Sequence, residues 1–415
     1  MKKFTFLLLV VLTLSSMWVF AQGTNILGQS YYNISTAVPF LSIAPDARAG
    51  AMGDIGCATS ADVNSQSYNP AKYVFSKNQF GFSFSYSPWM RNLVGDINHF
   101  YLAGYLKITD ADAIGASFRY ISEGEISYMD EFGNFTYIQK PNEYAIDLTY
   151  SRKLIDQLSI AVTPRLIYSD LDSSVKSKNG FAADLSLFYE QDFNAKGLSN
   201  STLRAGLCFS NLSFMKLAYT QPYDYPSYYT SSRYFLPANL KLGIGYEMDF
   251  DGHNKLTLNG EVNKLLVPTQ PIYAIDYETG RIIYDEDGNP IIAAGRNPDV
   301  SAPMGMIQSW YDAPGGFKEE MQEVMWALGM EYSYRDFVFA RFGYFHESPY
   351  KGDRQYLTVG AGIKYSIVGF DFSYLIATQR YFPLANTMRF TLSLDFVSAK
   401  KDEIKLQGRP WRKTN

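Results

Sequence analysis

Cysteine and histidine are scarce in this chain, and their scarcity argues against two classes of protein. Only two of the 415 residues are Cys and three are His. Disulfide scaffolds and zinc proteins need several such residues at short spacings, and the chain has no C-x-x-C and no H-E-x-x-H motif. Cys57 and Cys208 are far apart in the sequence, so their spacing leaves open whether they pair in an oxidising compartment. We expect no metal and no cofactor.

An apolar run long enough for a membrane-spanning helix is also missing. The apolar run at 4–14 is well short of the roughly 20 residues that a bilayer requires. Lys2 and Lys3 precede it, and Val19-Phe20-Ala21 follows it with small residues where a signal peptidase cuts. This order is typical of a secretory signal peptide, here residues 1–21. The sequence therefore predicts an exported protein.

Strong net charge is absent as well, whereas aromatic residues are abundant. The formal charge is −4, and a nucleic-acid-binding protein needs a basic face, so no nucleic-acid partner is expected. The chain contains 33 Tyr, 29 Phe and 31 Gly. An exported, aromatic-rich chain without apolar helices is typical of a transmembrane β-barrel, whose aromatic belts lie at the two membrane interfaces.

Alternation of apolar and polar residues supports this interpretation. Phe80, Phe82, Phe84 and Tyr86 alternate with Gly and Ser, which is the period of a strand with one apolar face. An even number of strands and a closed sheet are expected, because an open edge in lipid leaves backbone groups unpaired. The fold class predicted is all-β, a 14-stranded transmembrane antiparallel β-barrel in the outer membrane. Its fourteen strands are expected at 79–87, 97–107, 113–121, 142–152, 158–169, 180–190, 201–210, 233–248, 255–264, 323–333, 336–346, 356–365, 368–376 and 387–396.

Charged residues fall almost entirely on the polar face of these strands. A charge that faces lipid at the midplane costs about 2–4 kcal/mol, so this segregation is expected of a barrel wall. The eight acids and seven bases balance, which predicts ion pairs inside the barrel rather than an ion-selective pore. The inward-facing charges predicted are Arg119, Glu143, Asp147, Arg165, Asp184, Arg204, Lys241, Glu247, Glu261, Glu331, Arg341, Lys364, Asp371, Arg389 and Asp395.

Two regions lie outside the predicted barrel at 79–396. Residues 22–78 are rich in Ala, Gly and Ser and are irregular, and we interpret them as an N-terminal hatch or plug; a periplasmic docking segment is the alternative. The hydrophilic residues 397–415 form a basic periplasmic tail. A solvated tail is the simpler interpretation, and contact with anionic lipid is the other.

Connection lengths give the barrel an orientation. Every second connection is short, as periplasmic turns are, and the alternate ones are longer. The connection near 191–200 is longer than this rule predicts.

No catalytic motif is present. The sequence has no G-x-S-x-G elbow and no Walker loop, although an active site assembled only by the fold stays open. Residues 285–289, Asp-Glu-Asp-Gly-Asn, resemble part of a calcium loop but lack the ligand spacing of an EF-hand. Their apolar flanks favour a hairpin turn. We expect no catalytic residue.

The connection 265–322 is much longer than a barrel needs, and long loops of this kind are often functional. It contains aromatic, Met and Ile residues, and such side chains suit a protein-contact surface when they are exposed. A lid over the barrel mouth is the alternative. The partner-binding residues predicted are Met304, Met306, Ile307, Trp310 and Tyr311.

Several motifs resemble a known superfamily. The block Ala44–Gly53, followed by Ser67–Ala71, is similar to the N-terminal signature of the FadL-like outer-membrane transporters. Within that superfamily the chain most resembles the PorV-like proteins of the Bacteroidota type IX secretion system. The segments that carry this second resemblance are 235–239, 343–348, 358–362 and 370–375.

The resemblance implies a shuttle or adaptor. PorV-like proteins bind the C-terminal signal domain of cargo beside the large translocon barrel and deliver the cargo to a sortase-containing attachment complex at the cell surface. The implied partners are therefore that translocon barrel, the C-terminal domains of cargo, the attachment complex and outer-membrane lipid. The alternative is a FadL-like channel for hydrophobic small molecules.

Overall fold

The protein was analysed as a computed structural model that describes residues 34–130, 132–171, 178–195, 197–219, 232–378 and 383–396. The predicted signal peptide and the predicted basic tail lie outside these residues. Within the described part of the chain, no helix has both the length and the apolarity to cross a membrane.

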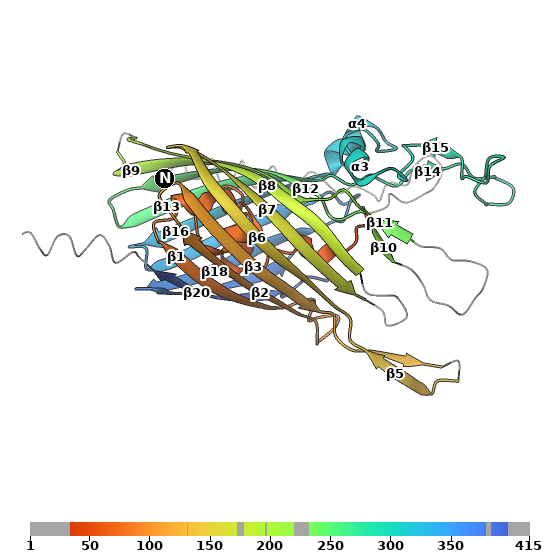
Figure 1. Cartoon of the computed structure of the whole chain (residues 1–415), viewed down its shortest axis with the longest axis horizontal. Coiled ribbons are helices and arrows are strands. Elements are labelled where there is room, and N and C mark those ends of the chain that lie inside the picture. The colour runs from red at the N-terminus through yellow and green to blue at the C-terminus, as the bar shows by residue number, and fades with distance from the viewer. Residues whose placement is uncertain are drawn as a thin grey trace, which may run out of the picture.

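Fourteen strands form one closed antiparallel barrel, as predicted (Figure 1). β1 pairs with β2 on one side and with β20 on the other, so the sheet has no free edge. The barrel strands are β1 (Phe80–Pro88), β2 (Asn98–Lys107), β3 (Asp112–Ser122), β6 (Asn142–Ile155), β7 (Leu158–Asp170), β8 (Lys178–Phe193), β9 (Asn200–Leu212), β12 (Asn239–Asp249), β13 (Asn254–Leu265), β16 (Val324–Tyr334), β17 (Val338–His346), β18 (Gln355–Tyr365), β19 (Val368–Ala377) and β20 (Met388–Phe396).

The two faces of the wall differ as the alternation predicts. On β1, Phe80, Phe82 and Phe84 are exposed on the outside, whereas Ser83 and Ser85 are fully buried inside. The same outward apolar and inward polar pattern continues around the sheet. A closed sheet with an apolar outer face is the arrangement that a hydrocarbon environment requires.

Most of the predicted inward-facing charges form ion pairs, which confirms the predicted ion pairs. Three buried Arg residues each lie between two carboxylates, so the desolvation of each is offset by two short charge-assisted bonds. The pairs are Arg165 with Asp147 at 2.6 Å and Asp184 at 2.9 Å, Arg204 with Glu190 at 2.7 Å and Glu247 at 2.8 Å, and Arg341 with Glu331 and Asp371, both at 2.6 Å.

Short turns gather at one end of the barrel and long connections at the other. The turns 156–157 and 366–367 are examples of the short end, whereas 123–141 and 266–323 lie at the long end. Bacterial barrels place long loops outside the cell, so we call the long-loop end the outer end. The long connections carry three small hairpins: β4 (Ile126–Met129) with β5 (Phe135–Gln139), β10 (Leu217–Tyr219) with β11 (Ser232–Tyr234), and β14 (Ile272–Tyr273) with β15 (Ile292–Ala294).

Two details differ from the sequence-based prediction. The strand predicted at 233–248 is interrupted: Ser232–Tyr234 belongs to the β10–β11 hairpin, and the barrel strand begins only at Asn239. Pro237 lacks the N–H that a central strand needs, which explains the break. The apparently long connection at 191–200 shrinks to 194–199, because β8 continues to Phe193.

Residues 34–78, which we call the inner segment, lie inside the barrel (Figure 1). They form the short helices η1 (Pro39–Ser42), α2 (Ala47–Gly50), η2 (Val63–Ser67) and η3 (Pro70–Phe75). These touch the wall on opposite sides: α2 contacts β18, β19 and β20, whereas η3 contacts β3, β6, β7 and β8.

Inward-facing glycines let the inner segment approach the wall. A Cβ at position 343 would lie 2.1 Å from the carbonyl carbon of Met52, and one at position 206 would lie 2.2 Å from the carbonyl oxygen of Cys57. Side chains at these two positions would therefore push the inner segment off β17 and β9. Cys57 and Cys208 are both buried free thiols.

Candidate functional site

The long loop between β13 and β16 holds the residues predicted to contact partners. Between 44% and 59% of the side chain is exposed in four of the five: Met304, Ile307, Trp310 and Tyr311. Spacings of three and four residues place Met304, Ile307 and Tyr311 on one side of α3 (Ala302–Gln308) and its continuation. We call Met304, Ile307, Trp310 and Tyr311 the outer apolar face. Met306 is half-buried and lies outside it.

Two further exposed apolar residues belong to the same loop but were not predicted. Phe317 is 80% exposed and Met321 is 52% exposed, and both lie on α4 (Phe317–Gln322). Their spacing of four residues puts them on one side of a helix, which is the signal that sequence analysis could have used.

α3 is held against the barrel mouth by close packing. A Cβ at position 305 would lie 2.5 Å from the ring of Phe235, so Gly305 allows the helix to rest on that ring. Lys216 lies 4.4 Å from the centre of the same ring and pairs with Asp299 of the loop at 3.2 Å. The carbonyl of Phe235 accepts a 2.8 Å hydrogen bond from the amide of Ala37 in the inner segment. The loop, the mouth and the inner segment are therefore in continuous contact.

A buried ion cluster supports α4. Lys351 pairs with Glu319 at 2.6 Å and with Glu323 at 2.9 Å, and Lys264 of β13 pairs with Glu323 at 2.6 Å and with Glu320 at 3.2 Å. All five side chains are at least nine-tenths buried. The cluster ties the loop to β13 and to the connection after β17, so the loop has a fixed base.

Asp312 lies beside this cluster. One of its carboxylate oxygens accepts a hydrogen bond of 3.1 Å from the amide of Thr269, and the other is buried without a partner. Burial and the carboxylates of Glu320 and Glu323 raise the pKa of Asp312 to about 7. This group is thus the titratable residue of the loop that changes charge near neutral pH.

The segment 285–289 is a hairpin turn, as its flanks indicated. The carboxylate of Asp285 accepts a 2.8 Å hydrogen bond from the amide of Asn289, and Gly288 has the positive φ that the turn requires. Tyr284 and Pro290 form an antiparallel bridge across it.

The β4–β5 hairpin is a second exposed apolar surface that sequence analysis did not single out. It extends beyond the barrel mouth and pairs with no other strand of the described chain (Figure 1). Tyr128 and Tyr137 stack at 4.6 Å between ring centres, whereas Phe132 is 81% exposed. An isolated hairpin is only marginally stable in water, so this one is suited to partner contact.

Metal-binding side chains are not brought together in the described residues. No group of three or more His, Cys, Asp and Glu residues there could hold a metal ion. The three His residues lie apart: His99 is buried inside the barrel, His253 is exposed in a short turn, and His346 ends β17. The three His side chains therefore do not form one site.

Solved structures that are similar to the chain include hydrocarbon transporters and a FadL homologue. The toluene transporter TodX of Pseudomonas putida is 11% identical with a TM-score of 0.46, and covers 88% of this chain and 98% of its own. The monoaromatic hydrocarbon channel CymD is 11% identical with a TM-score of 0.47, covering 85% and 98%. A Pseudomonas aeruginosa FadL homologue is 9% identical with a TM-score of 0.43, covering 88% and 100%. The strand topology described above, rather than these distant likenesses, carries the fold assignment.

A family comparison is more specific. No curated protein sequence matches the chain. The family model described as type IX secretion system protein PorV matches residues 28–272, which is more than half of the chain. The closed fourteen-strand wall with its apolar outer face agrees with an outer-membrane location. The chain is an outer-membrane β-barrel that belongs to the PorV family of the type IX secretion system.

Proposed function

We propose that this protein is a cargo-docking adaptor of type IX secretion. It binds the C-terminal signal domain of a secreted protein at the large translocon barrel and hands that protein to the sortase-containing attachment complex. The family match supports the secretion role, and the surface of the long loop supports docking.

The observation that carries the proposal is an apolar surface on a fixed base. Trp, Met and Ile side chains on an exposed surface are costly to leave in water and are typical of protein-contact surfaces. The buried ion cluster of Lys264 and Lys351 holds the loop that presents them. A surface that is already ordered loses less entropy on binding than a flexible loop does.

The proposal includes closure of the bore by the inner segment. Arg48 of this segment pairs with Glu331 of β16 at 2.9 Å, and the amide of Ala47 donates to Thr391 of β20 at 2.9 Å. On the opposite side, the hydroxyl of Ser151 on β6 donates to the carbonyl of Pro70 at 2.8 Å. These bonds across the bore weigh against the alternative, a channel for hydrophobic small molecules, which requires an open apolar path.

Charge placed in the outer apolar face tests the docking role. We expect Ile307→Glu or Trp310→Glu to reduce recovery of cargo with the protein from mildly solubilised membranes about tenfold, because central apolar contacts dominate such interfaces. The measurement is co-purification of cargo and of the large translocon barrel, together with the amount of cargo at the cell surface.

The matched control is Tyr277→Glu. Tyr277 is an 81% exposed aromatic of the same loop and does not belong to the outer apolar face. It should leave cargo recovery unchanged. Unaltered recovery and secretion in both Ile307→Glu and Trp310→Glu would disprove docking by this face.

A further inference from the structure

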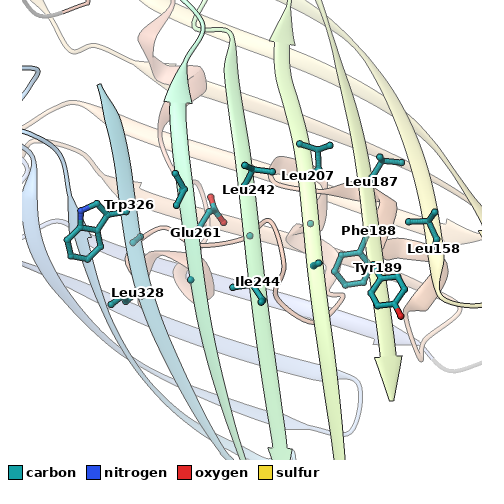
Figure 2. A pocket seen from close by; sticks show the side chains of 16 residues that line it. Leu158, Leu187, Phe188, Tyr189, Leu207, Leu242, Ile244, Glu261, Trp326 and Leu328 are labelled. Carbon is teal, nitrogen blue, oxygen red and sulfur yellow. The ribbon is translucent and has the colours of Figure 1, made fainter. Parts of the chain in front are cut away.

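A groove of about 600 Å³ crosses the outer wall of the barrel from β7 to β16 (Figure 2). Its lining is apolar apart from the ends of a few side chains. The one charged residue, Glu261, has its carboxylate turned inward, where it accepts hydrogen bonds from the amides of Gly56 and Cys57 at 3.0 and 2.8 Å. The groove therefore presents no charge to the outside.

Two small residues create the groove. Strand register aligns one outward row in the order Tyr189, Ala205, Ile244, Gly260 and Leu328. Large side chains thus alternate with an Ala and a Gly across neighbouring strands. A Cβ at position 260 would have its nearest neighbours at 3.7 and 3.8 Å, which is ordinary contact, so a side chain at Gly260 would meet no clash.

A second row forms one long side of the groove. It runs through Leu187, Leu207, Leu242, Val262 and Trp326, which are adjacent in register (Figure 2). The polar atoms that the outward rows offer are the Tyr189 hydroxyl and the Trp326 indole N–H, near the two ends. Between them the two outward rows have no side-chain hydrogen-bonding group.

The groove is long enough to hold a lipid chain. Neighbouring strands are about 4.8 Å apart, so five strand spacings from β7 to β16 span roughly 24 Å. One leaflet occupies about half of a hydrocarbon core that is roughly 30 Å thick, or about 15 Å. The volume also lies within the range of roughly 300–1,000 Å³ that ligand sites have.

An apolar groove in the lipid-facing wall does not stay empty. A water molecule in the groove would have no hydrogen-bonding partner. An empty groove would leave its lining side chains without dispersion contacts on one side. We propose that the groove binds one acyl chain of an outer-membrane lipid. This lipid stays bound while lipids on the convex parts of the wall exchange with the bilayer. A hydrocarbon chain in the concavity touches more protein than a chain on a convex part of the wall does. This site is separate from the cargo-docking surface and does not depend on the proposed function.

Filling the groove tests the proposal. The protein is reconstituted into nanodiscs of palmitoyl-oleoyl phosphatidylethanolamine, and native mass spectrometry counts the lipids that remain bound on release. We expect the wild type to retain one phospholipid, and Gly260→Leu to lower the occupancy of that lipid about tenfold, because its side chain takes the place of the acyl chain. Ala205→Leu places a large side chain in the same groove from another strand, and we expect the same loss of bound lipid. If one of the two variants fails to fold, the other still tests the proposal.

Gly104→Leu is the matched control. Gly104 also faces outward, on β2, with its nearest neighbours at 3.4 and 3.7 Å from a Cβ, and it lies outside the groove. It should retain lipid like the wild type. Equal lipid counts in the wild type and in both groove variants overturn the proposal. Loss of a co-purifying membrane protein from Gly260→Leu with no change in lipid also overturns it, because the occupant would then be a protein.

Discussion

Arg48 joins the inner segment to the barrel wall through one side chain. Its guanidinium contacts Glu331 at 2.9 and 3.0 Å and Asp62 at 2.9 Å, and it is almost fully buried. Removing one member of a buried ion network leaves the partners without compensation, which costs about 3–5 kcal/mol. We expect Arg48→Ala to lower the free energy of unfolding by about 3 kcal/mol, since Arg341 still pairs with Glu331. Urea unfolding followed by tryptophan fluorescence measures the change.

Arg152 provides the comparison for Arg48. It forms an ion pair with Asp112 at 3.6 Å, but its side chain is 60% exposed. Exposed ion pairs contribute little to stability because water and salt screen them, so Arg152→Ala should hardly change the unfolding curve. Equal losses from Arg48→Ala and Arg152→Ala would contradict a structural role for the inner network.

Asp312 gives the long loop a predicted pH dependence. Its pKa is raised from 3.8 to about 7 in the folded protein. The stabilising contribution of its protonated form is complete below about pH 4 and is lost as the pH rises through 7. Burial acts to raise the pKa of Glu323, but Lys351 and Lys264 outweigh burial and lower it, so Glu323 stays ionised in this window.

Hydrogen exchange in residues 266–323 tests this dependence. After correction for the intrinsic rate at each pH, we expect protection of the loop in the wild type to fall between pH 5 and pH 8. Asp312→Asn carries no titratable group and should keep its protection at pH 8. The prediction is wrong if the variant shows the same pH dependence as the wild type.

At the scale of elements, strands were easier to predict than their exact ends. Period-two alternation identified every barrel strand, because successive side chains of a strand point to opposite faces of the sheet. This rule depends only on neighbouring residues. The strand predicted at 233–248 begins too early. Pro237 and the hydrogen bond between Phe235 and Ala37 divert the chain before β12. That contact joins residues far apart in the sequence and leaves no local signal.

The fit between the inner segment and β17 predicts a glycine requirement. A Cβ at position 343 would lie 2.1 and 2.2 Å from backbone atoms of Met52 and Gly53, which cannot yield as a side chain can. Overpacking of this kind costs about 1–3 kcal/mol. We expect Gly343→Ala to destabilise the protein by that amount and to make the inner segment accessible to protease.

Gly104→Ala is the control for this strand contact. The nearest atom to a Cβ at position 104 is at 3.4 Å, which is ordinary contact. Thermal unfolding should be unchanged in that variant. If Gly343→Ala unfolds at the same temperature as the wild type, the inner segment is not packed against β17 as described.

At the scale of the whole molecule, the inner segment and the wall behave as one unit. Contacts from η2, η3 and α2 reach strands around the circumference. Closure of the bore predicts no steady conductance for the wild type in a planar lipid bilayer. Deletion of residues 34–78 should produce a steady conductance, provided that heat-dependent gel migration shows a folded barrel. An open wild-type channel would favour the hydrophobic-compound alternative.

The candidate site was predictable in part. The length and composition of the 265–322 connection identified the loop, and the structure exposes Met304, Ile307, Trp310 and Tyr311, although their role in binding stays a prediction. Met306 is half-buried and is less accessible than those four residues. The ion cluster below them was not predictable, since it joins Lys264 of β13 with Lys351 and Glu319 from two separate connections.

The sequence by itself determined the fourteen strands, their apolar outer face and the balance of charge inside, because alternation and composition act within a few neighbouring residues. Only the tertiary structure decided where residues 34–78 lie, which charges pair and where the outer wall is hollow. Arg48 and Glu331 are 283 positions apart, and Ala205 and Gly260 meet in one row only through the register of three strands. Such contacts depend on closure of the sheet, which brings distant residues within bonding distance without any trace in the local pattern.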